Sequence, residues 1–154
     1  MTAPPIPASL LLQIVTPDKM LVRDQVDEVE IPGSEGYFGV LPGHTPMLAS
    51  LAVGEMWYRT GQEKTYLSLA FGFAEVLPDR VTILAQIAER AEEIDSARAE
   101  EAKKRAEARL QQAKDIDYER ARAALQKALV RLQVSSRMQL AGRVGRPRVP
   151  PPQA

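Results

Sequence analysis

Few side chains in this sequence could carry covalent or metal chemistry. The chain of 154 residues has no cysteine and one histidine, His44. Thiolate nucleophiles and thiolate metal ligands are therefore excluded, and no second imidazole completes a metal or general-base site around His44. The sequence also lacks a glycine-rich loop of the kind that holds phosphates. We therefore predict no catalytic residue, no metal site and no required cofactor.

Basic residues in the C-terminal part are the better candidates for binding chemistry. If two antiparallel helices turn at 114–115, Arg98 lies opposite Arg131, and Lys127 lies opposite Ala102. Cations that gather in this way need carboxylates or a bound anion to neutralise them. The pattern therefore indicates an anion site at the open end of a helical hairpin.

A second interpretation of these residues needs no ligand. Asp95 then only caps a helix start, and Arg98 and Arg105 are solvated. If they are paired, Glu101 and Glu92 are the nearby acids. The sequence leaves both interpretations open.

The same helices present further bases to solvent or to a partner. They include Lys103, Lys104, Arg109 and Arg122, beside Arg105, Lys127 and Arg131. An acidic protein surface could bind them, although such residues also form ordinary solvated faces. A nucleic-acid-binding hairpin is a further alternative, but the 20 basic and 20 acidic residues cancel, and acids are interleaved with the bases.

The elements that must position these residues fall into two parts. Neither glycine nor proline occurs between Pro78 and Gly142, whereas both are frequent before that gap. Because both residues are costly inside helices and frequent in turns, the gap predicts helix and the earlier part predicts strands. We expect a flexible N-terminus over 1–9, a head over 10–88, a helical hairpin over 89–138 and a disordered tail, rich in proline and arginine, over 139–154.

The head is predicted to be an antiparallel β-sandwich or flattened barrel of about 8 to 10 strands. Turn sequences such as Pro32-Gly33-Ser34 and Pro42-Gly43-His44 separate short β-prone runs. The candidate strands are 10–15, 20–23, 26–31, 37–41, 47–51, 56–59, 65–69, 71–77 and 81–85. The chain as a whole is therefore α+β, with strands first and helices second.

A short internal repeat predicts the two helix starts. Ile94-Asp95 and Ile116-Asp117 each combine an apolar residue with an aspartate that can cap a helix of about 18 residues. Apolar residues follow at helical spacing, and they are mostly alanine: Ala99, Ala102, Ala106, Leu110 and Ala113, then Tyr118, Ala121, Leu125, Ala128 and Leu132. Since a buried methyl contributes only about 0.8 kcal/mol, we expect a marginally stable hairpin that ligands or partners can move.

Three stretches resemble one known family. They are GSEGYFGVLPGHTPML (33–48), GFAEV (72–76) and IDSARA (94–99). Together and in this order they resemble the epsilon subunit of the bacterial F-type ATP synthase over residues 10–138. The resemblance implies a noncatalytic subunit of the central stalk that binds the gamma subunit and the membrane rotor ring of c subunits. It also implies a mobile hairpin that restrains ATP hydrolysis when it extends.

The resemblance also implies roles for particular residues. Ser34, Glu35 and His44 would contact the rotor ring, although ordinary turn chemistry also explains them. Lys103, Lys104, Arg109 and Arg122 would contact the alpha and beta catalytic subunits when the hairpin extends. A pattern for binding regulatory ATP, with magnesium, corresponds to Glu89, Asp95, Arg98, Ala99, Arg105 and Arg131, with Lys127 in place of an arginine.

The resemblance and the sequence together set a location. No apolar run reaches the roughly 20 residues of a membrane span, and the N-terminus lacks a secretory signal. We expect a peripheral protein at the cytoplasmic face of the bacterial inner membrane, with no nucleic acid partner. A freestanding ATP-sensing module is the alternative function.

Overall fold

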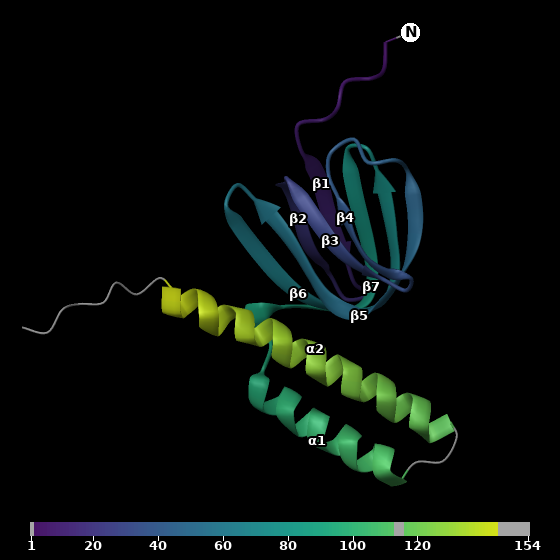
Figure 1. Ribbon diagram of the computed structural model, residues 1–154, viewed down its shortest axis with the longest axis vertical. Helices are drawn as coiled ribbons and strands as arrows, with labels where there is room; N and C mark the ends of the chain where they lie inside the picture. Colours follow the sequence, from purple (N-terminus) through teal and green to yellow (C-terminus); the bar gives the residue numbers. More distant parts are fainter. Residues whose placement is uncertain (1, 113–115, 145–154) are drawn as a thin grey trace, which may run out of the picture.

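The computed structural model describes residues 2–112 and 116–144. A β head and a pair of helices make up the structure, and the helices lie beneath one end of the head (Figure 1). The two-part division and the α+β fold class are confirmed.

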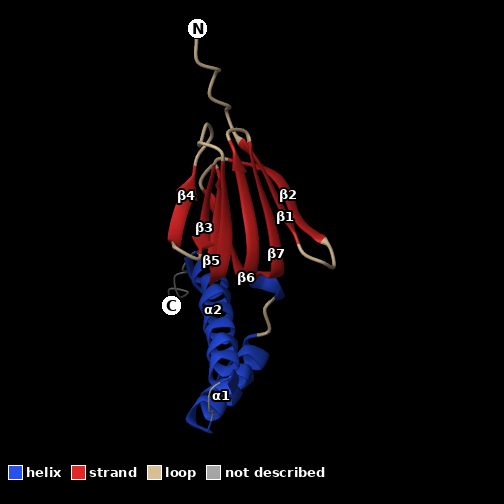
Figure 2. Cartoon of the chain, turned by 90° about the vertical axis from the view of Figure 1, so that its right-hand side faces the viewer, coloured by secondary structure: helices blue, strands red, loops and turns tan. Residues whose placement is uncertain are grey.

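Seven strands form one hydrogen-bonded sheet, which curls into a sandwich (Figure 2). The strand order is β2-β1-β7-β6-β5-β3-β4. The strands are β1 (Leu10–Val15), β2 (Met20–Val26), β3 (Glu28–Gly33), β4 (Gly36–Val40), β5 (Met47–Thr60), β6 (Glu63–Leu77) and β7 (Arg80–Arg90). Neighbours are antiparallel except β1 and β7, which are parallel and therefore differ from the predicted pairing.

The predicted number of strands was too high because β5 and β6 are longer than expected. Runs 47–51 and 56–59 belong to one strand of 14 residues, and runs 65–69 and 71–77 belong to one strand of 15 residues. Gly54 lies between the two runs of β5 and Gly72 at the start of the second run of β6, and neither glycine ends its strand. Long bent strands thus serve both layers of the sandwich.

The bend in β6 lies at Phe71 and Gly72. In the register with β5 and with β7, Ala70 and Gly72 have partners and Phe71 does not. Phe71 has a φ of 59° and Gly72 a φ of 125°, while the pairing register is the same on both sides of Phe71, so the strand bends here without an inserted residue. A side chain at Gly72 would collide with the Leu84 carbonyl oxygen of β7 at 1.9 Å, so only glycine fits there.

The core of the head lies between the two layers. Along β1, fully buried and half-buried residues alternate, as expected for a strand with one face inward. The largest buried side chains come from both layers: Leu10, Leu12, Ile14, Ile31, Met56, Leu67, Leu69 and Ile83. This core cluster contains only residues of the strands, so the head carries its own core.

A short 3-10 helix, η1 (Ala91–Glu93), links the head to α1 (Ser96–Gln112) and α2 (Ile116–Val144). The predicted cap at Asp95 is confirmed, because the Arg98 backbone N–H donates to its Oδ1 at 3.1 Å. The prediction for Asp117 was wrong: it lies in the first turn of α2. α2 has 29 residues and continues through 139–144, the start of the predicted tail, while 145–154 lie outside the described residues.

The predicted alanine-rich seam joins the helices. Ala99 and Ala106 of α1 and Ala121 and Ala128 of α2 are buried. Tyr118 is the exception, since 46% of it is exposed. α2 lies between α1 and the head and makes the main contacts with β5, β6 and η1 (Figure 1). Ala113 lies outside the described residues.

Candidate head–hairpin site

One side of α2 packs against the head through a small apolar cluster. Val134 is fully buried against Ala91 and Ile94, and Tyr66 and Val130 pack around them. Val130 and Val134 are four residues apart and therefore lie on the same face of α2. This face also carries the basic side chains that meet the head.

Arg131 is paired with Glu89, at the end of β7. Arg131 Nη2 donates to Glu89 Oε2 at 3.0 Å, and its Nε lies 3.0 Å from Oε1. Only about a quarter of each side chain is exposed. The sequence predicted that either a carboxylate or a bound anion neutralises Arg131. In this structure the carboxylate of Glu89 does so.

Arg137 makes a second two-point ion pair, with Glu55 of β5. Its Nη2 donates to Glu55 Oε1 at 2.9 Å and its Nε to Oε2 at 3.2 Å. Glu55 is only 7% exposed. The guanidinium carbon lies 5.0 Å from the centre of the Tyr66 ring, a distance for cation–π attraction. The hydrogen bonds to Glu55 raise the pKa of Arg137, so it stays charged at any physiological pH.

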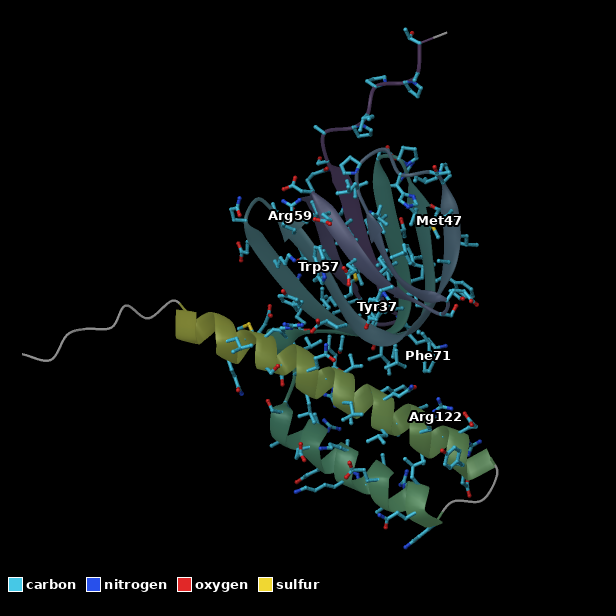
Figure 3. All side chains as sticks on the ribbon, in the orientation of Figure 1. Tyr37, Met47, Trp57, Arg59, Phe71 and Arg122 are labelled. Carbon is cyan, nitrogen blue, oxygen red and sulfur yellow. The ribbon has the colours of Figure 1, made fainter. Side chains whose placement is uncertain are left out.

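A third contact joins Lys127 to the bend of β6. Lys127 Nζ lies 5.3 Å from the centre of the Phe71 ring, and Figure 3 shows Phe71 at the corner of the head that faces α2. Beside this contact, a cavity of about 240 Å³ separates the head from the helices. Glu89, Lys127 and Arg131 line it together with aliphatic side chains of β5, β6 and α2. Ala102 also lines this cavity, as the predicted helix register requires.

The other candidate ATP residues lie outside this cavity. Asp95 caps α1, Arg98 and Arg105 are exposed, and Ala99 is buried in the seam. The structure therefore brings together Glu89, Lys127 and Arg131 and leaves the α1 residues apart. Lys127 and Arg131 have the charge to hold a phosphate, but Arg131 would have to exchange Glu89 for it.

The residues expected to contact the catalytic subunits occupy the outer part of the hairpin. Lys104, Arg109 and Arg122 are exposed (Figure 3 labels Arg122), and Lys103 pairs with Glu100 at 3.8 Å. Among residues 2–112 and 116–144, no group of three His, Cys, Asp or Glu side chains could hold a metal ion. Within the same ranges, no helix is both long and apolar enough to cross a membrane.

The residues expected at the rotor ring occupy two loops of the head. Ser34 and Glu35 form the exposed β3–β4 turn, where the Ser34 backbone N–H donates to Ser50 O at 2.9 Å. The hydroxyls of Ser34 and Ser50 are also hydrogen-bonded. His44 lies in the loop before β5 and its Nδ1 is 2.6 Å from Thr45 O. Ser34 and Glu35 line one shallow cavity beside β5, which does not include His44.

Sequence reasoning missed Glu55, Arg137, Tyr66 and Phe71. One signal was present: Glu55 is the single charged residue in the apolar run from Leu51 to Tyr58. A charge in such a strand needs a partner when it is buried. The sequence held no corresponding signal for the partner, which lies 82 residues away.

An apolar strip covers part of the outer face of the head. Phe73 and Leu84 are cross-strand neighbours on β6 and β7, and each is more than half exposed. Together with Val15 and Pro17 they line a shallow groove. Leu48 of β5, also on an outer surface, is 72% exposed. Neighbouring exposed apolar side chains that line a groove are a feature of protein-binding faces.

Comparisons with known proteins identify related sequences and folds. Residues 9–91 match the ATP synthase delta/epsilon chain beta-sandwich domain, and residues 92–136 match the long alpha-helix domain of the same chain. The ATP synthase epsilon chain of Koribacter versatilis is 62% identical over 99 residues, which are 64% of this chain and 70% of that protein. ATP synthase epsilon chain 2 of Syntrophotalea carbinolica is 49% identical over 137 residues, which are 89% of this chain and 96% of that protein.

A solved structure has the same arrangement of strands and helices. A chain in the Euglena gracilis mitochondrial ATP synthase, resolved as OSCP/F1/c-ring, matches with a TM-score of 0.76 and 26% sequence identity. The match covers 90% of this chain and 86% of that chain. A chain in the central stalk and c-ring structure of the Tetrahymena thermophila mitochondrial ATP synthase has a TM-score of 0.55 at 13% identity, which supports the fold alone.

Proposed function

This chain belongs to the delta/epsilon family of ATP synthase subunits, as a noncatalytic epsilon chain of the central stalk, and from this premise we propose that its hairpin regulates ATP hydrolysis. In this proposal the hairpin is docked on the head while hydrolysis is permitted. It leaves the head and extends toward the alpha and beta catalytic subunits when hydrolysis is restrained.

The nature of the docking contact carries this proposal. α2 meets the head through one face, with a small apolar cluster and two Arg–Glu pairs, while α1 packs mainly on α2. The core cluster of the head is made of strand residues and contains no residue of the helices. An element attached in this way can leave as a unit without unfolding the head, because most of the head core lies between the strands, and Leu69 is the core residue that also lines the cavity under α2.

We propose that the head binds the gamma subunit and the c-subunit rotor ring. The exposed strip of Phe73 and Leu84 supports a protein partner on the outer face, since apolar side chains gain from burial. Ser34, Glu35 and His44 are accessible, polar loop residues of the kind that contact polar loops of the ring. A peripheral location at the cytoplasmic face of the bacterial membrane follows from this assembly.

Deletion of residues 91–154 tests the regulatory role in the assembled complex. The truncated head should assemble, because its core is intact, and ATP hydrolysis should increase. Assembly is checked by co-purification of the subunits, so that loss of the head is not mistaken for loss of restraint. Unchanged hydrolysis in a fully assembled complex would contradict regulation by the hairpin.

We also propose that ATP binds as a regulatory ligand and is not hydrolysed. Lys127 and Arg131 would hold phosphate, and Arg98 would contribute from α1 after a local rearrangement. Calorimetric titration of the isolated chain with MgATP tests this: Arg98→Ala should weaken binding, and Lys127→Arg should strengthen it because a planar guanidinium binds phosphate at two points. Arg120→Ala, an exposed arginine of α2, is the control. Equal affinity for MgATP in all variants would contradict the proposed nucleotide site.

A further inference from the structure

We infer that Glu55, Arg137 and Tyr66 form a latch that holds the hairpin on the head without a nucleotide. This inference rests on the proposed regulation by the hairpin, because a latch matters only if the hairpin moves. None of the three residues belongs to the ATP pattern. The latch therefore gives the docked state a source of stability that is separate from any ligand.

The latch contains the more buried carboxylate of the two ion pairs between α2 and the head: the Glu55 side chain is 9% exposed and that of Glu89 25%, while the Arg137 side chain is 40% exposed. Two hydrogen bonds of 2.9 and 3.2 Å join Arg137 to Glu55, which is 7% exposed. Tyr66 packs against the guanidinium at 5.0 Å. Paired geometry of this kind is directional, so Arg137 has one favourable position on the head.

The head holds its side of the latch in place. The Glu55 backbone N–H donates to the hydroxyl of Tyr37 at 3.2 Å, which ties β5 to β4. A side chain at Gly54 would lie 2.6 Å from the same hydroxyl, so the adjacent glycine makes room for Tyr37. Figure 3 shows Tyr37 near the end of the head that faces α2. Tyr37 is therefore a positioning residue for Glu55.

The pair of Arg131 and Glu89 cannot replace this latch when nucleotide binds. Glu89, Lys127 and Arg131 line the cavity proposed for phosphate, and a phosphate there would compete with Glu89 for Arg131. Arg137 and Glu55 do not line that cavity. The latch therefore remains closed whether or not the cavity is occupied.

The Glu55 carboxylate has a different environment in the docked and undocked states of the hairpin. In the docked state its carboxylate is buried beside Ser68, its cross-strand neighbour, which is 5% exposed. In the undocked state water can reach it. Removal of Arg137 therefore leaves an unpaired buried charge in the docked state only, and shifts the equilibrium toward undocking.

Hydrogen exchange of the isolated full-length chain, without nucleotide, tests the latch. In the wild type, the amides of residues 124–138 should be protected with or without MgATP. Arg137→Met should increase their exchange about tenfold or more, the effect of losing hydrogen bonds to a charged group. Arg120→Met, at an exposed position of α2, is the matched control and should exchange like the wild type.

A double variant separates the latch from a general packing effect. Glu55→Gln removes the buried charge, so the double variant with Arg137→Met should exchange more slowly than Arg137→Met alone. Fluorescence of Trp57, the only tryptophan and the cross-strand neighbour of Tyr66, gives a second readout. The latch is wrong if Arg137→Met exchanges like the wild type, if the double variant shows no rescue, or if the wild type is protected only with MgATP.

Hydrolysis by the assembled complex distinguishes the latch from the proposed function. With a working latch and a regulatory hairpin, Arg137→Met should lower hydrolysis and deletion of 91–154 should raise it. If deletion has no effect while Arg137→Met still speeds exchange, the regulatory function fails and the latch stands as a structural contact. If deletion raises hydrolysis and Arg137→Met changes neither exchange nor activity, the latch fails alone.

Discussion

Replacing Gly72 by alanine should destabilise the head severely. Gly72 has a φ of 125°, and its added Cβ would lie 1.9 Å from the Leu84 carbonyl oxygen and 3.0 Å from the Cα of Ala85. Both obstacles are backbone atoms of β7, so no side-chain rotation can relieve them. β6 and β7 must separate at the bend that supports the two layers.

The size of this effect follows from two costs. A residue with a side chain in such a conformation costs about 1–3 kcal/mol. Separation of the strands loses one or two ladder hydrogen bonds, at about 1 kcal/mol each. The sum is roughly 2–5 kcal/mol, a large part of the stability of a typical domain.

Alanine substitutions at three glycines of the head distinguish the cost of the backbone conformation from the cost of the collision with β7. Gly39 has open space where its Cβ would lie, so Gly39→Ala should change stability by less than about 0.5 kcal/mol. Gly36 has a φ of 128° and equally open space, so Gly36→Ala measures the backbone conformation alone. Only Gly72→Ala adds the collision.

Urea denaturation followed by Trp57 fluorescence measures all three variants. With a slope of about 1–3 kcal/mol per molar, Gly72→Ala should lower the midpoint by about 2 M or prevent folding. The urea midpoint should fall most for Gly72→Ala, less for Gly36→Ala and least for Gly39→Ala. If Gly72→Ala unfolds no more easily than Gly36→Ala, the collision with β7 does not exist and the described bend is wrong.

Further predictions concern the helices and their docking. Asp95→Ala should destabilise α1 by about 1 kcal/mol, because the Arg98 amide loses its acceptor, and circular dichroism melting of the helices should detect it. Val134→Ala removes about two buried methyl equivalents, or roughly 1–2 kcal/mol, and should speed hydrogen exchange in α2 without lowering the urea midpoint of the head. The bond to Glu55 raises the pKa of Arg137, so its contribution is complete below the ordinary arginine pKa and is lost only as pH rises through the raised value. Docking measured by Trp57 fluorescence should therefore not weaken through Arg137 between about pH 7 and 10.

Local chemistry explains why much of the fold could be predicted. Proline and glycine act on their own backbone, so their absence after Pro78 correctly indicated the helices from Ser96 onward, although β7 (Arg80–Arg90) lies in the same gap. The cap at Asp95 depends on residues within one helical turn, and it is present as predicted. The alternation of apolar residues located the strands, but the ends of β5 and β6 were wrong because a bend and a turn have similar composition.

The candidate site was only partly predictable. Register arithmetic placed Lys127 beside Ala102, since helix spacing is regular. It did not show that Arg131 would meet Glu89 of the head, because helix spacing says nothing about what lies against the outer face of the pair.

The sequence by itself determined the division into a strand-rich head and two helices, the start of α1 and the small side chains between the helices. These features depend on neighbours within a few residues or on one repeated spacing. Only the tertiary structure decided which face of α2 meets the head, how β6 bends at Phe71 and that Glu55 pairs with Arg137. Those contacts join segments that are distant in the chain, and their geometry depends on packing that no local pattern records.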